Sequence, residues 1–142
     1  MEIRKNTVAD IEQLVQIWYE SSIKAHDFIN HEYWDAQKQD MKEKYLPMSE
    51  TYVLCVDQEI IGFVSVVGQY LAALFIANDY QGNGYGKELV SFIKQKRKHL
   101  QLKVYAKNEQ AVQFYLKNHF LKKQELIDEQ TGEKEMLMEW KK

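Results

Sequence analysis

The centre of the chain reads Gln81-Gly82-Asn83-Gly84-Tyr85-Gly86-Lys87, with glycine at every second position. An apolar stretch over residues 70–77 precedes this segment and predicts a strand that is buried on both faces at the centre of a sheet. An amphipathic stretch over 87–98 follows it and predicts a helix. Alternate glycines let a loop between a strand and a helix turn sharply and approach a ligand closely. Because the N–H groups at the start of a helix favour negative charge, the segment predicts a site for phosphate or pyrophosphate.

Two well-known phosphate-binding loops do not fit this segment. The dinucleotide-binding fingerprint needs its third glycine at position 87, where the chain has Lys87, and an acidic residue about 20 positions later, where it has none. The P-loop needs glycine at position 81 and Ser or Thr after the lysine, where the chain has Gln81 and Glu88. A tight turn that only starts a helix is the structural alternative.

The remaining segments predict a mixed sheet with helices on both faces. Besides 70–77, strands are expected over 3–5, 51–56, 60–67, 100–106, 120–127 and 133–140. Besides 87–98, helices are expected from a capping box at Thr7 to about Glu20, over 31–46 up to Pro47, and over 108–117. The order βααβββαβαββ, with hairpins first and helical connections later, indicates an α/β (α+β) fold. A length of 142 residues predicts one domain over 1–142.

A second pattern begins at Asn108, between the expected strand and the expected helix. Asn108, Ala111 and Phe114-Tyr115 fit the spacing Asn-x-x-Ala-x-x-Phe-Tyr, and the central segment fits Gln-x-x-Gly-x-Gly. In this order and on these elements, the two patterns resemble motifs B and A of the GNAT (Gcn5-related) N-acetyltransferases. The resemblance covers essentially the whole chain and is strongest to small bacterial protein-lysine acetyltransferases of the YiaC/YjaB type. The residues that carry it are His26-Asp27-Phe28-Ile29, Trp34, residues 70–76, Val104-Tyr105 and Lys107-Asn108.

One position departs from the family pattern. His119 stands where a glycine usually precedes Phe120. Glycine and, less readily, asparagine take the left-handed conformation that ends many helices, and histidine takes it less well than Asn118 would. The end of this helix is therefore expected to be atypical.

The resemblance implies that the chain moves an acetyl group from acetyl-CoA to an amine by direct attack and releases coenzyme A. It implies that the pantetheine arm runs along Leu74, Phe75 and Ile76, where their strand separates from 102–104. It implies that the pyrophosphate lies on the backbone N–H groups of Gln81, Gly82, Asn83, Gly84, Tyr85, Gly86 and Lys87, with the Lys87 charge added. Asn108, Phe114 and Lys117 are then expected to flank the lower arm and the adenosine.

Tyr115 matches the general acid of the family. A phenol with a pKa of about 10 stays protonated at neutral pH and can donate to a departing thiolate. The structural alternative is a tyrosine that only packs beside Phe114 on an amphipathic helix.

The resemblance implies an acceptor site after the first helix, at His26 and Phe28, and Tyr70 at the start of the central strand is expected to face it. The attacking amine must be neutral, whereas lysine has a pKa of about 10.4, so a base is expected. His26 is the best candidate because imidazole titrates near about 6.5. A structural role for His26, with Asp27 or Phe28 as the constrained residue, and a Tyr70 that only covers the edge of the core are the alternatives.

The resemblance favours lysine side chains of proteins as the acceptor. A small amine, such as an antibiotic, a polyamine or an amino acid, is the second hypothesis. A coenzyme A-binding regulator without turnover is the third, and the presence of Tyr115 and Asn108 argues against it.

Composition disfavours several classes of partner. The 19 basic and 21 acidic residues leave a net charge of -2, which provides no protein-wide positive field for nucleic acid. The longest apolar run, 71–77, is far shorter than the about 20 residues that span a bilayer, and no apolar leader follows Met1, so no membrane partner is expected. The single Cys55 excludes an internal disulfide and predicts a reducing, cytoplasmic location.

Two further expectations concern metals and assembly. Direct acyl transfer to an amine needs no Lewis acid, and the sequence contains no cluster of ligand residues, so no metal is expected. A homodimer through the C-terminal strands is predicted as cover for an edge strand that ends at Trp140.

Overall fold

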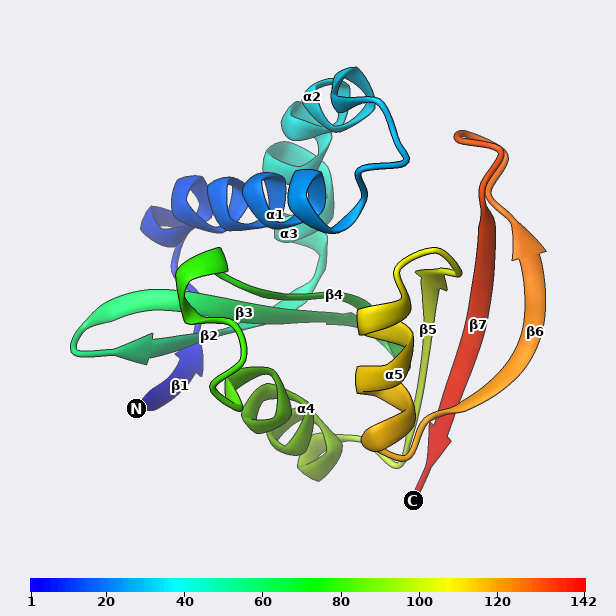
Figure 1. Cartoon of the computed structure of the whole chain (residues 1–142). Coiled ribbons are helices and arrows are strands. Elements are labelled where there is room, and N and C mark those ends of the chain that lie inside the picture. The colour runs from blue at the N-terminus through cyan, green and yellow to red at the C-terminus, as the bar shows by residue number, and fades with distance from the viewer.

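A seven-stranded mixed sheet organises the computed structural model, which describes residues 1–142 (Figure 1). Its order is β1-β2-β3-β4-β5-β7-β6, and β4 and β5 are the neighbours that run parallel. The strands are β1 (Glu2–Lys5), β2 (Glu50–Val56), β3 (Glu59–Val67), β4 (Tyr70–Ile76), β5 (His99–Tyr105), β6 (Leu121–Ile127) and β7 (Lys134–Lys141). The predicted fold class is therefore confirmed.

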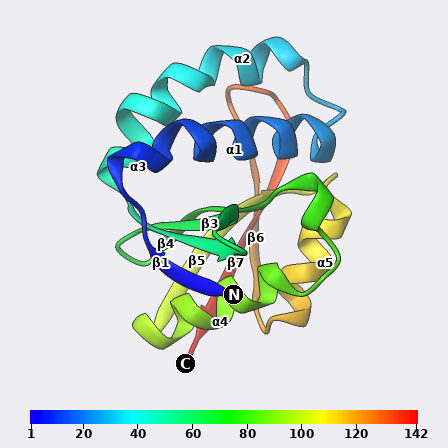
Figure 2. The ribbon, with the colours of Figure 1, turned by 90° about the vertical axis from the view of Figure 1, so that its left-hand side faces the viewer.

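Four main helices cover the two faces of this sheet (Figures 1 and 2). They are α1 (Ile11–Ala25) and α2 (His31–Asp40) on one face, and α4 (Tyr85–Lys96) and α5 (Glu109–Lys117) on the other. α2 continues into a π-helical turn (Met41–Tyr45) and a last turn, α3 (Leu46–Met48), and two 3-10 turns are η1 (Val8–Asp10) and η3 (Asn78–Tyr80). None of the helices combines the length and the apolar character needed to cross a membrane.

Each face of the sheet has its own apolar core, because successive side chains of a strand point to opposite faces. Phe63 belongs to the core that contains Leu14 of α1. The next residue, Val64, belongs to the core that contains Leu89 and Ile93 of α4. β3 is therefore buried on both faces and holds the two helical layers together.

β4 and β5 separate soon after they begin. Their one register pair is Tyr70 with Gln101. Just beyond it, Ala72 has no partner in β3, so β4 carries a bulge at this point. A bulge bends its strand, and the two strands consequently open into a V in the middle of the sheet (Figure 1). The predicted separation of β4 from 102–104 is confirmed.

The V corrects one prediction about β4. The strand is central, as expected, but it is not buried on both faces: Tyr70 and Ala72 are exposed, and the last three residues are half-buried. The last three residues are only half-buried because β5, which would cover their open edge, has moved away from them.

Several helix ends also differ from the predicted ones. α1 continues past Glu20 to Ala25, and α4 begins at Tyr85, so the last residues of the glycine segment belong to the helix. Pro47 does not end the second helix but lies in its last turn, α3, where the structure tolerates a missing N–H.

The strand that ends near Trp140 is not an edge strand. β7 lies between β5 and β6, and Trp140 stands opposite Leu100 of β5. The closing hairpin inserts its second strand into the sheet and leaves β6 at the edge. The reason given for a homodimer is therefore wrong, and the homodimer itself stays a prediction.

The end of α5 is a Schellman motif with histidine in the glycine position. The Phe120 N–H donates to the Tyr115 carbonyl at 3.0 Å, and the His119 N–H donates to the Leu116 carbonyl at 3.1 Å. His119 has a φ of 71°, in the left-handed region, whereas Asn118 does not. The Phe120 ring packs on the Tyr115 ring with centroids 5.5 Å apart, so this helix end also supports Tyr115.

Replacing His119 by glycine is expected to raise the free energy of unfolding by about 1 kcal/mol. A side chain in the left-handed conformation costs about 1–2 kcal/mol, and the larger freedom of glycine in the unfolded chain offsets part of the gain. For a chain of this length we expect a Tm about 3 to 5 °C higher. Thermal unfolding followed by circular dichroism measures the effect. Asn118→Gly, at a φ of -97°, is the control and should lower the Tm; a lower Tm for His119→Gly would contradict the strain.

Candidate functional site

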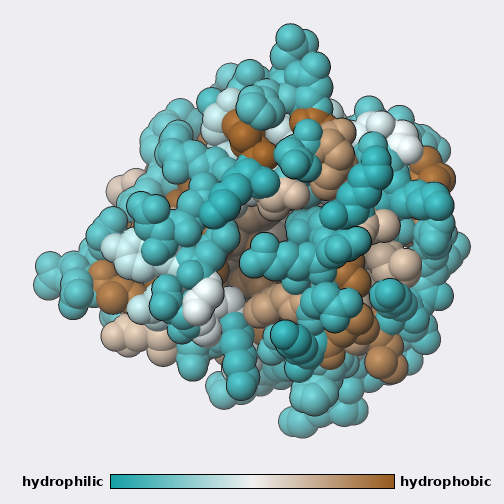
Figure 3. All heavy atoms as spheres, in the orientation of Figure 1, coloured by the Kyte–Doolittle hydropathy of each residue, from teal (hydrophilic) through white to brown (hydrophobic).

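A cavity of about 920 Å³ opens where β4 and β5 part. Its wall is formed by α1, α2 and the turns after it, β4, β5, α5, and the β6–β7 turn. On the surface it is seen as a hollow with an apolar floor between α1 and α5 (Figure 3). Its volume is that of a site for a small molecule or a cofactor.

The cavity brings together predicted site residues from distant parts of the chain. Those on its wall are His26, Tyr70, Leu74, Phe75, Asn108 and Tyr115. The predicted residues outside its wall are Phe28, Ile76, Phe114, Lys117 and the glycine segment 81–87.

Tyr115 is buried on α5 and faces the cavity. Its ring packs between Phe114 and Phe120, with centroids 5.2 and 5.5 Å away. Its hydroxyl takes part in none of the side-chain hydrogen bonds within the chain, although it lies close enough to Tyr70 to be influenced by it. Burial, with a contribution from Tyr70, raises the pKa of the Tyr115 hydroxyl well above its ordinary value, so the group is a proton donor at neutral pH.

The glycine segment presents a row of free N–H groups. The backbone N–H groups of residues 82–87 take part in none of the hydrogen bonds of the structure. Gly82 and Gly84 have φ values of 82° and 84°, which only glycine adopts without strain, and Gly84 caps the 12-residue helix α4. These N–H groups lie at the positive end of the helix dipole, and Lys87 is exposed beside them. The segment is therefore built to hold an anion.

Two polar side chains brace this segment from within. The Gln81 amide donates to the Ile76 carbonyl at 3.0 Å, and the Asn83 amide donates to the Tyr80 carbonyl at 3.1 Å. Gln81 and Asn83 thus hold the loop shape with their side chains and leave the backbone N–H groups of Gly82 and Gly84 free.

Gly86 has a packing role that the sequence pattern did not indicate. A Cβ atom on Gly86 would lie 3.2 Å from two atoms of the Phe114 ring. The glycine therefore lets α4 approach α5, and Phe114 packs under the start of α4. Lys117, one turn further along α5, is exposed.

The open edge of β4 consists mainly of the residues before Ile76. The Ile76 carbonyl already accepts hydrogen bonds from Ser21 Oγ at 3.1 Å and from Gln81 Nε2 at 3.0 Å. Leu74 and Phe75 line the cavity, and β5 does not pair with them. Their backbone is the part of the predicted strand edge that remains accessible to an amide-bearing ligand.

His26 lies at the end of α1 in a mainly aromatic environment. Its ring stacks on Trp34 with centroids 5.1 Å apart, and it meets Tyr105 edge-on at 5.1 Å. The Asn108 side chain caps α5 by accepting from the Ala111 N–H, so its amide nitrogen donates to His26 Nε2 at 3.2 Å. Burial lowers the pKa of His26 to about 4, so the imidazole is neutral at physiological pH and its Nε2 is occupied. This arrangement favours a structural role over that of a base.

The buried His26 predicts a loss of stability in mild acid. The unfolded chain takes up a proton on this residue below pH 6.5, whereas the folded chain does so only near pH 4. The free energy of unfolding should therefore fall as the pH drops from 6.5 to 4, by about 1.4 kcal/mol per pH unit and about 3 kcal/mol in total. Urea unfolding at several pH values measures this slope. His26→Gln, which stays neutral, should flatten it, and an equal slope in the variant would contradict the burial effect.

Two other predicted acceptor-site residues lie in different places. Tyr70 is exposed at the closed end of the V, where β4 pairs with β5, and lines the cavity; partial burial raises its pKa. Phe28 packs edge-on against His26 and Tyr105 with centroids 5.7 and 5.8 Å away and does not reach the cavity wall. Its role in binding an acceptor stays a prediction.

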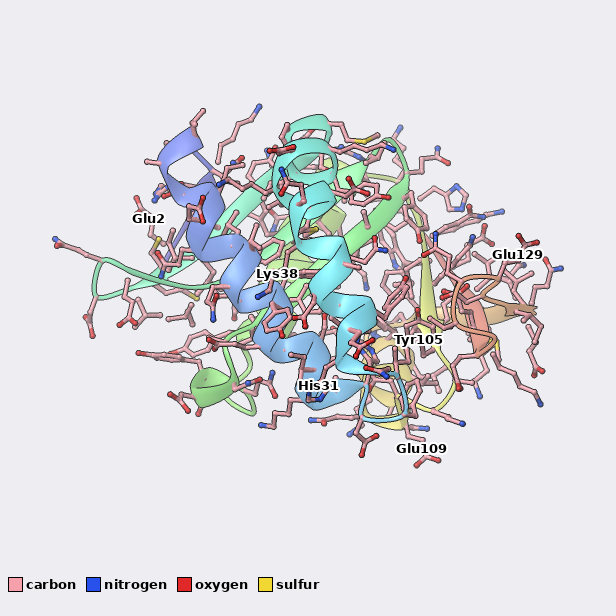
Figure 4. The ribbon with its side chains drawn as sticks, turned by 90° about the horizontal axis from the view of Figure 1, so that it is seen from above. Glu2, His31, Lys38, Tyr105, Glu109 and Glu129 are labelled. Carbon is pink, nitrogen blue, oxygen red and sulfur yellow. The ribbon has the colours of Figure 1, made fainter.

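The cavity wall also contains residues to which the sequence patterns assign no role. They are Trp34 from α2, Tyr105 from β5, Asp128 from the β6–β7 turn and Glu135 from β7. Seen from above, Tyr105 lies between α2 and the turn that carries Glu129 (Figure 4). Trp34 and Tyr105 belong to the segments that resemble the family, but nothing in the sequence indicates that the carboxylates are near them.

Hydrogen bonds position the β6–β7 turn against the rest of the cavity wall. The Tyr105 hydroxyl donates to Asp128 Oδ2 at 2.6 Å, and the Tyr33 hydroxyl of α2 donates to Gln130 Oε1 at 2.8 Å. The turn is thereby fixed to β5 and to α2 at once, so its carboxylates have a defined place beside the cavity.

Comparison with known proteins agrees with this architecture. Residues 47–121 match a family model described as an acetyltransferase (GNAT) domain. The peptidyl-lysine N-acetyltransferase YiaC of Escherichia coli (strain K12) is 34% identical over 114 residues, which cover 80% of this chain and 78% of YiaC. The peptidyl-lysine N-acetyltransferase YjaB of Salmonella typhimurium is 35% identical over 121 residues, 84% of this chain and 83% of YjaB.

Solved structures show the same fold. The solution structure of apo-form YjaB from Escherichia coli has a TM-score of 0.87 and 30% identity, and the match covers 98% of this chain and 96% of that one. The PaiA N-acetyltransferase of Thermoplasma acidophilum, crystallised in complex with coenzyme A, has a TM-score of 0.85 and 24% identity over 99% of this chain and 98% of that one.

Proposed function

The chain belongs to the GNAT family of acetyltransferases, and from this premise we propose that it transfers the acetyl group of acetyl-CoA to lysine side chains of proteins. Membership of the family makes it an acyltransferase of the N-acetyltransferase class. The acetyl-CoA supplies an acetyl group activated as a thioester, and coenzyme A is the product.

The observation that carries this proposal is the combination of the free N–H row with the cavity. The N–H groups of residues 82–87 lack partners, they lie at the start of α4, and β4 leads from them back to the cavity wall at Leu74. A ligand with a diphosphate at one end and an amide-bearing arm at the other matches both features. Coenzyme A has this chemistry.

Other residues support the same ligand. Lys87 lies near the start of α4 and Lys117 at the end of α5. Both are exposed cations, suited to phosphate groups. Phe114 lies under Gly86 and would flank the arm, and Asn108 lines the cavity where its amide also holds His26. We propose cofactor contacts for these residues together with Leu74, Phe75 and the segment 81–87.

We assign Tyr115 the role of general acid. Its hydroxyl faces the cavity, has no partner within the chain, and keeps its proton because burial raises its pKa. Donation to the sulfur as the thioester bond breaks stabilises the negative charge that develops there.

Lysine side chains are the acceptor that the relatives support best. YiaC and YjaB, each 34% or more identical to this chain, are named peptidyl-lysine N-acetyltransferases. The cavity is open to the surface, as an acceptor on another protein requires. A small amine is the second candidate, and the unpartnered Tyr115 hydroxyl argues against a regulator that only binds coenzyme A.

Two features of the whole chain belong to this proposal. We propose that residues 1–142 act as one domain, because a single sheet joins both cores. We also propose that the protein works in the cytoplasm, where its free, buried Cys55 would stay reduced and acetyl-CoA is available.

Incubation with acetyl-CoA and a panel of acceptors tests the proposal. Peptides that contain one lysine should gain one acetyl group, detected by mass spectrometry, whereas peptides with that lysine replaced by norleucine should not. Acetyl-CoA alone should raise the Tm, because it binds the folded state. Acetylation of small amines only would contradict the lysine assignment, and neither transfer nor a change in Tm would contradict the proposed function as a whole.

A further inference from the structure

An acceptor lysine reaches the site as an ammonium ion, and the residues assigned so far do not remove its proton. Lysine has a pKa of about 10.4, and only the neutral amine has the lone pair that attacks a carbonyl carbon. A group on the cavity wall must bind the cation and take the proton. The identity of this base rests on the proposed function, because only an amine acceptor requires one.

Most titratable groups on the cavity wall are unsuitable as this base. His26 is neutral, but its Nε2 accepts from Asn108 and its Nδ1 is buried away from the open cavity. Asp128 accepts three hydrogen bonds, from the Tyr105 hydroxyl, the Thr131 hydroxyl and the Gln130 N–H. Burial raises the pKa of Tyr70 and of Tyr105, so neither accepts a proton at neutral pH.

Glu135 is the half-buried carboxylate on the cavity wall that remains without a partner. It takes part in none of the hydrogen bonds or ion pairs of the structure, whereas the other cavity carboxylates are either bonded, as Asp128 is, or exposed, as Glu129 is. It stands opposite Tyr105 in the β5–β7 ladder, and residues opposite each other point to the same face. Glu135 therefore lies on the face that Tyr105 shares with His26.

Glu135 lines the same cavity as Tyr70 and Tyr115. Its charge contributes to the raised pKa of Tyr70, and Tyr70 in turn contributes to the raised pKa of Tyr115. Tyr33 of α2 also responds to its charge. Asp128 and Lys103 face it from the β6–β7 turn and from β5, with opposite effects. Desolvation and Asp128 together raise the pKa of Glu135, and this makes it a better base than an exposed carboxylate.

We propose that Glu135 binds the ammonium group of the acceptor lysine and removes its proton. The carboxylate and the ammonium become a carboxylic acid and a neutral amine. The amine nitrogen then forms a bond to the acetyl carbon, the carbon–sulfur bond breaks, and the sulfur takes the Tyr115 proton. The nitrogen releases its second proton to solvent, Glu135 releases the proton that it took, and Tyr115 regains one from solvent. The products are then the acetylated lysine and coenzyme A with a thiol, with one net proton released.

Glu135→Gln tests this role, because it keeps the shape of the side chain and removes the carboxylate. At pH 7 we expect kcat/KM for a lysine peptide to fall about 100-fold, the effect of losing a general base, with an unchanged Kd for acetyl-CoA. Above pH 7 the ratio of kcat/KM between the wild-type protein and the variant should fall by about tenfold per pH unit, since solvent then deprotonates the lysine. Glu135→Asp should recover part of the activity.

The matched control is Glu125→Gln on the edge strand β6. Glu125 is exposed, lies outside the cavity wall, and pairs with Lys134 at 3.6 Å, so the variant makes the same charge change in the same hairpin. Its kcat/KM should change less than about twofold. If the wild-type protein acetylates the peptide and Glu135→Gln is equally active, or loses the same factor in kcat/KM at every pH, the role of Glu135 is overturned and the proposed function stands. Absence of wild-type turnover on the lysine peptide would overturn the proposed function and this inference with it.

Discussion

Gly84→Asp should bind acetyl-CoA at least about 100-fold more weakly than the wild-type protein. The substitution puts a carboxylate among the N–H groups of residues 82–87, where the diphosphate is proposed to lie. Like charges placed together in a binding site cost several kcal/mol, and each tenfold loss corresponds to about 1.4 kcal/mol. A Cβ atom at Gly84 has no atom within 4 Å, so the new side chain finds space, although the φ of 84° strains it. Isothermal titration calorimetry measures the change in Kd.

The control for this variant has the same strain and the same charge elsewhere. Gly68, in the turn between β3 and β4, has a φ of 59° and also has no atom within 4 Å of a built Cβ. Gly68→Asp should lose a similar amount of stability and keep its affinity for acetyl-CoA. Equal affinities for the wild-type protein and Gly84→Asp, or equal losses in the two variants, would contradict the placement of the diphosphate.

Tyr115→Phe should lower kcat by about 100-fold and leave the Kd for acetyl-CoA nearly unchanged. A positioned acid of this kind contributes about 100-fold or more to a proton transfer. Because the Tyr115 hydroxyl has no hydrogen-bond partner within the chain, its removal leaves no buried group unpaired, and the Tm should change little. The ring remains to pack against Phe120. Steady-state kinetics, calorimetric titration and thermal unfolding separate the three effects.

A second tyrosine provides the comparison. Tyr52 packs against Phe92, and its hydroxyl binds Glu50, outside the cavity wall. Tyr52→Phe should keep its kcat. Because burial raises the pKa of Tyr115, the wild-type kcat should also not decline through this group between pH 8 and 10. A Tyr115→Phe variant with full turnover would remove this residue as the acid.

Local sequence was sufficient to predict the glycine segment and its neighbours. The φ values of Gly82 and Gly84 are ones that glycine adopts without strain, and the apolar periodicity after them predicted α4. The pattern from Asn108 to Tyr115 placed the start of α5, and the structure adds that the Asn108 side chain caps this helix. These features depend on residues within one or two helical turns of each other, so they can be predicted from the sequence.

The proposed base for the acceptor lysine could not be predicted from local sequence. Histidine has an ordinary pKa near neutrality, and on residue type alone His26 was the better candidate. The structure buries His26 against Trp34, which lowers its pKa to about 4, and leaves Glu135 half-buried and unpaired on the cavity wall. Burial lowers the pKa of His26 and raises the pKa of Glu135, and burial is set by elements that are distant in sequence.

The amino-acid sequence by itself determined the order of the elements and the glycine turn that begins α4, because periodicity, caps and glycine conformations act over a few neighbouring residues. The proposed acid, Tyr115, was predicted from the family resemblance. The tertiary structure alone decided the bulge at which β4 and β5 part, the position of β6 rather than β7 at the edge, and the place of Glu135 on the same cavity wall as Tyr70. These depend on strand register, on one bulge at Ala72 and on desolvation, which arise only when segments far apart in the chain pack together.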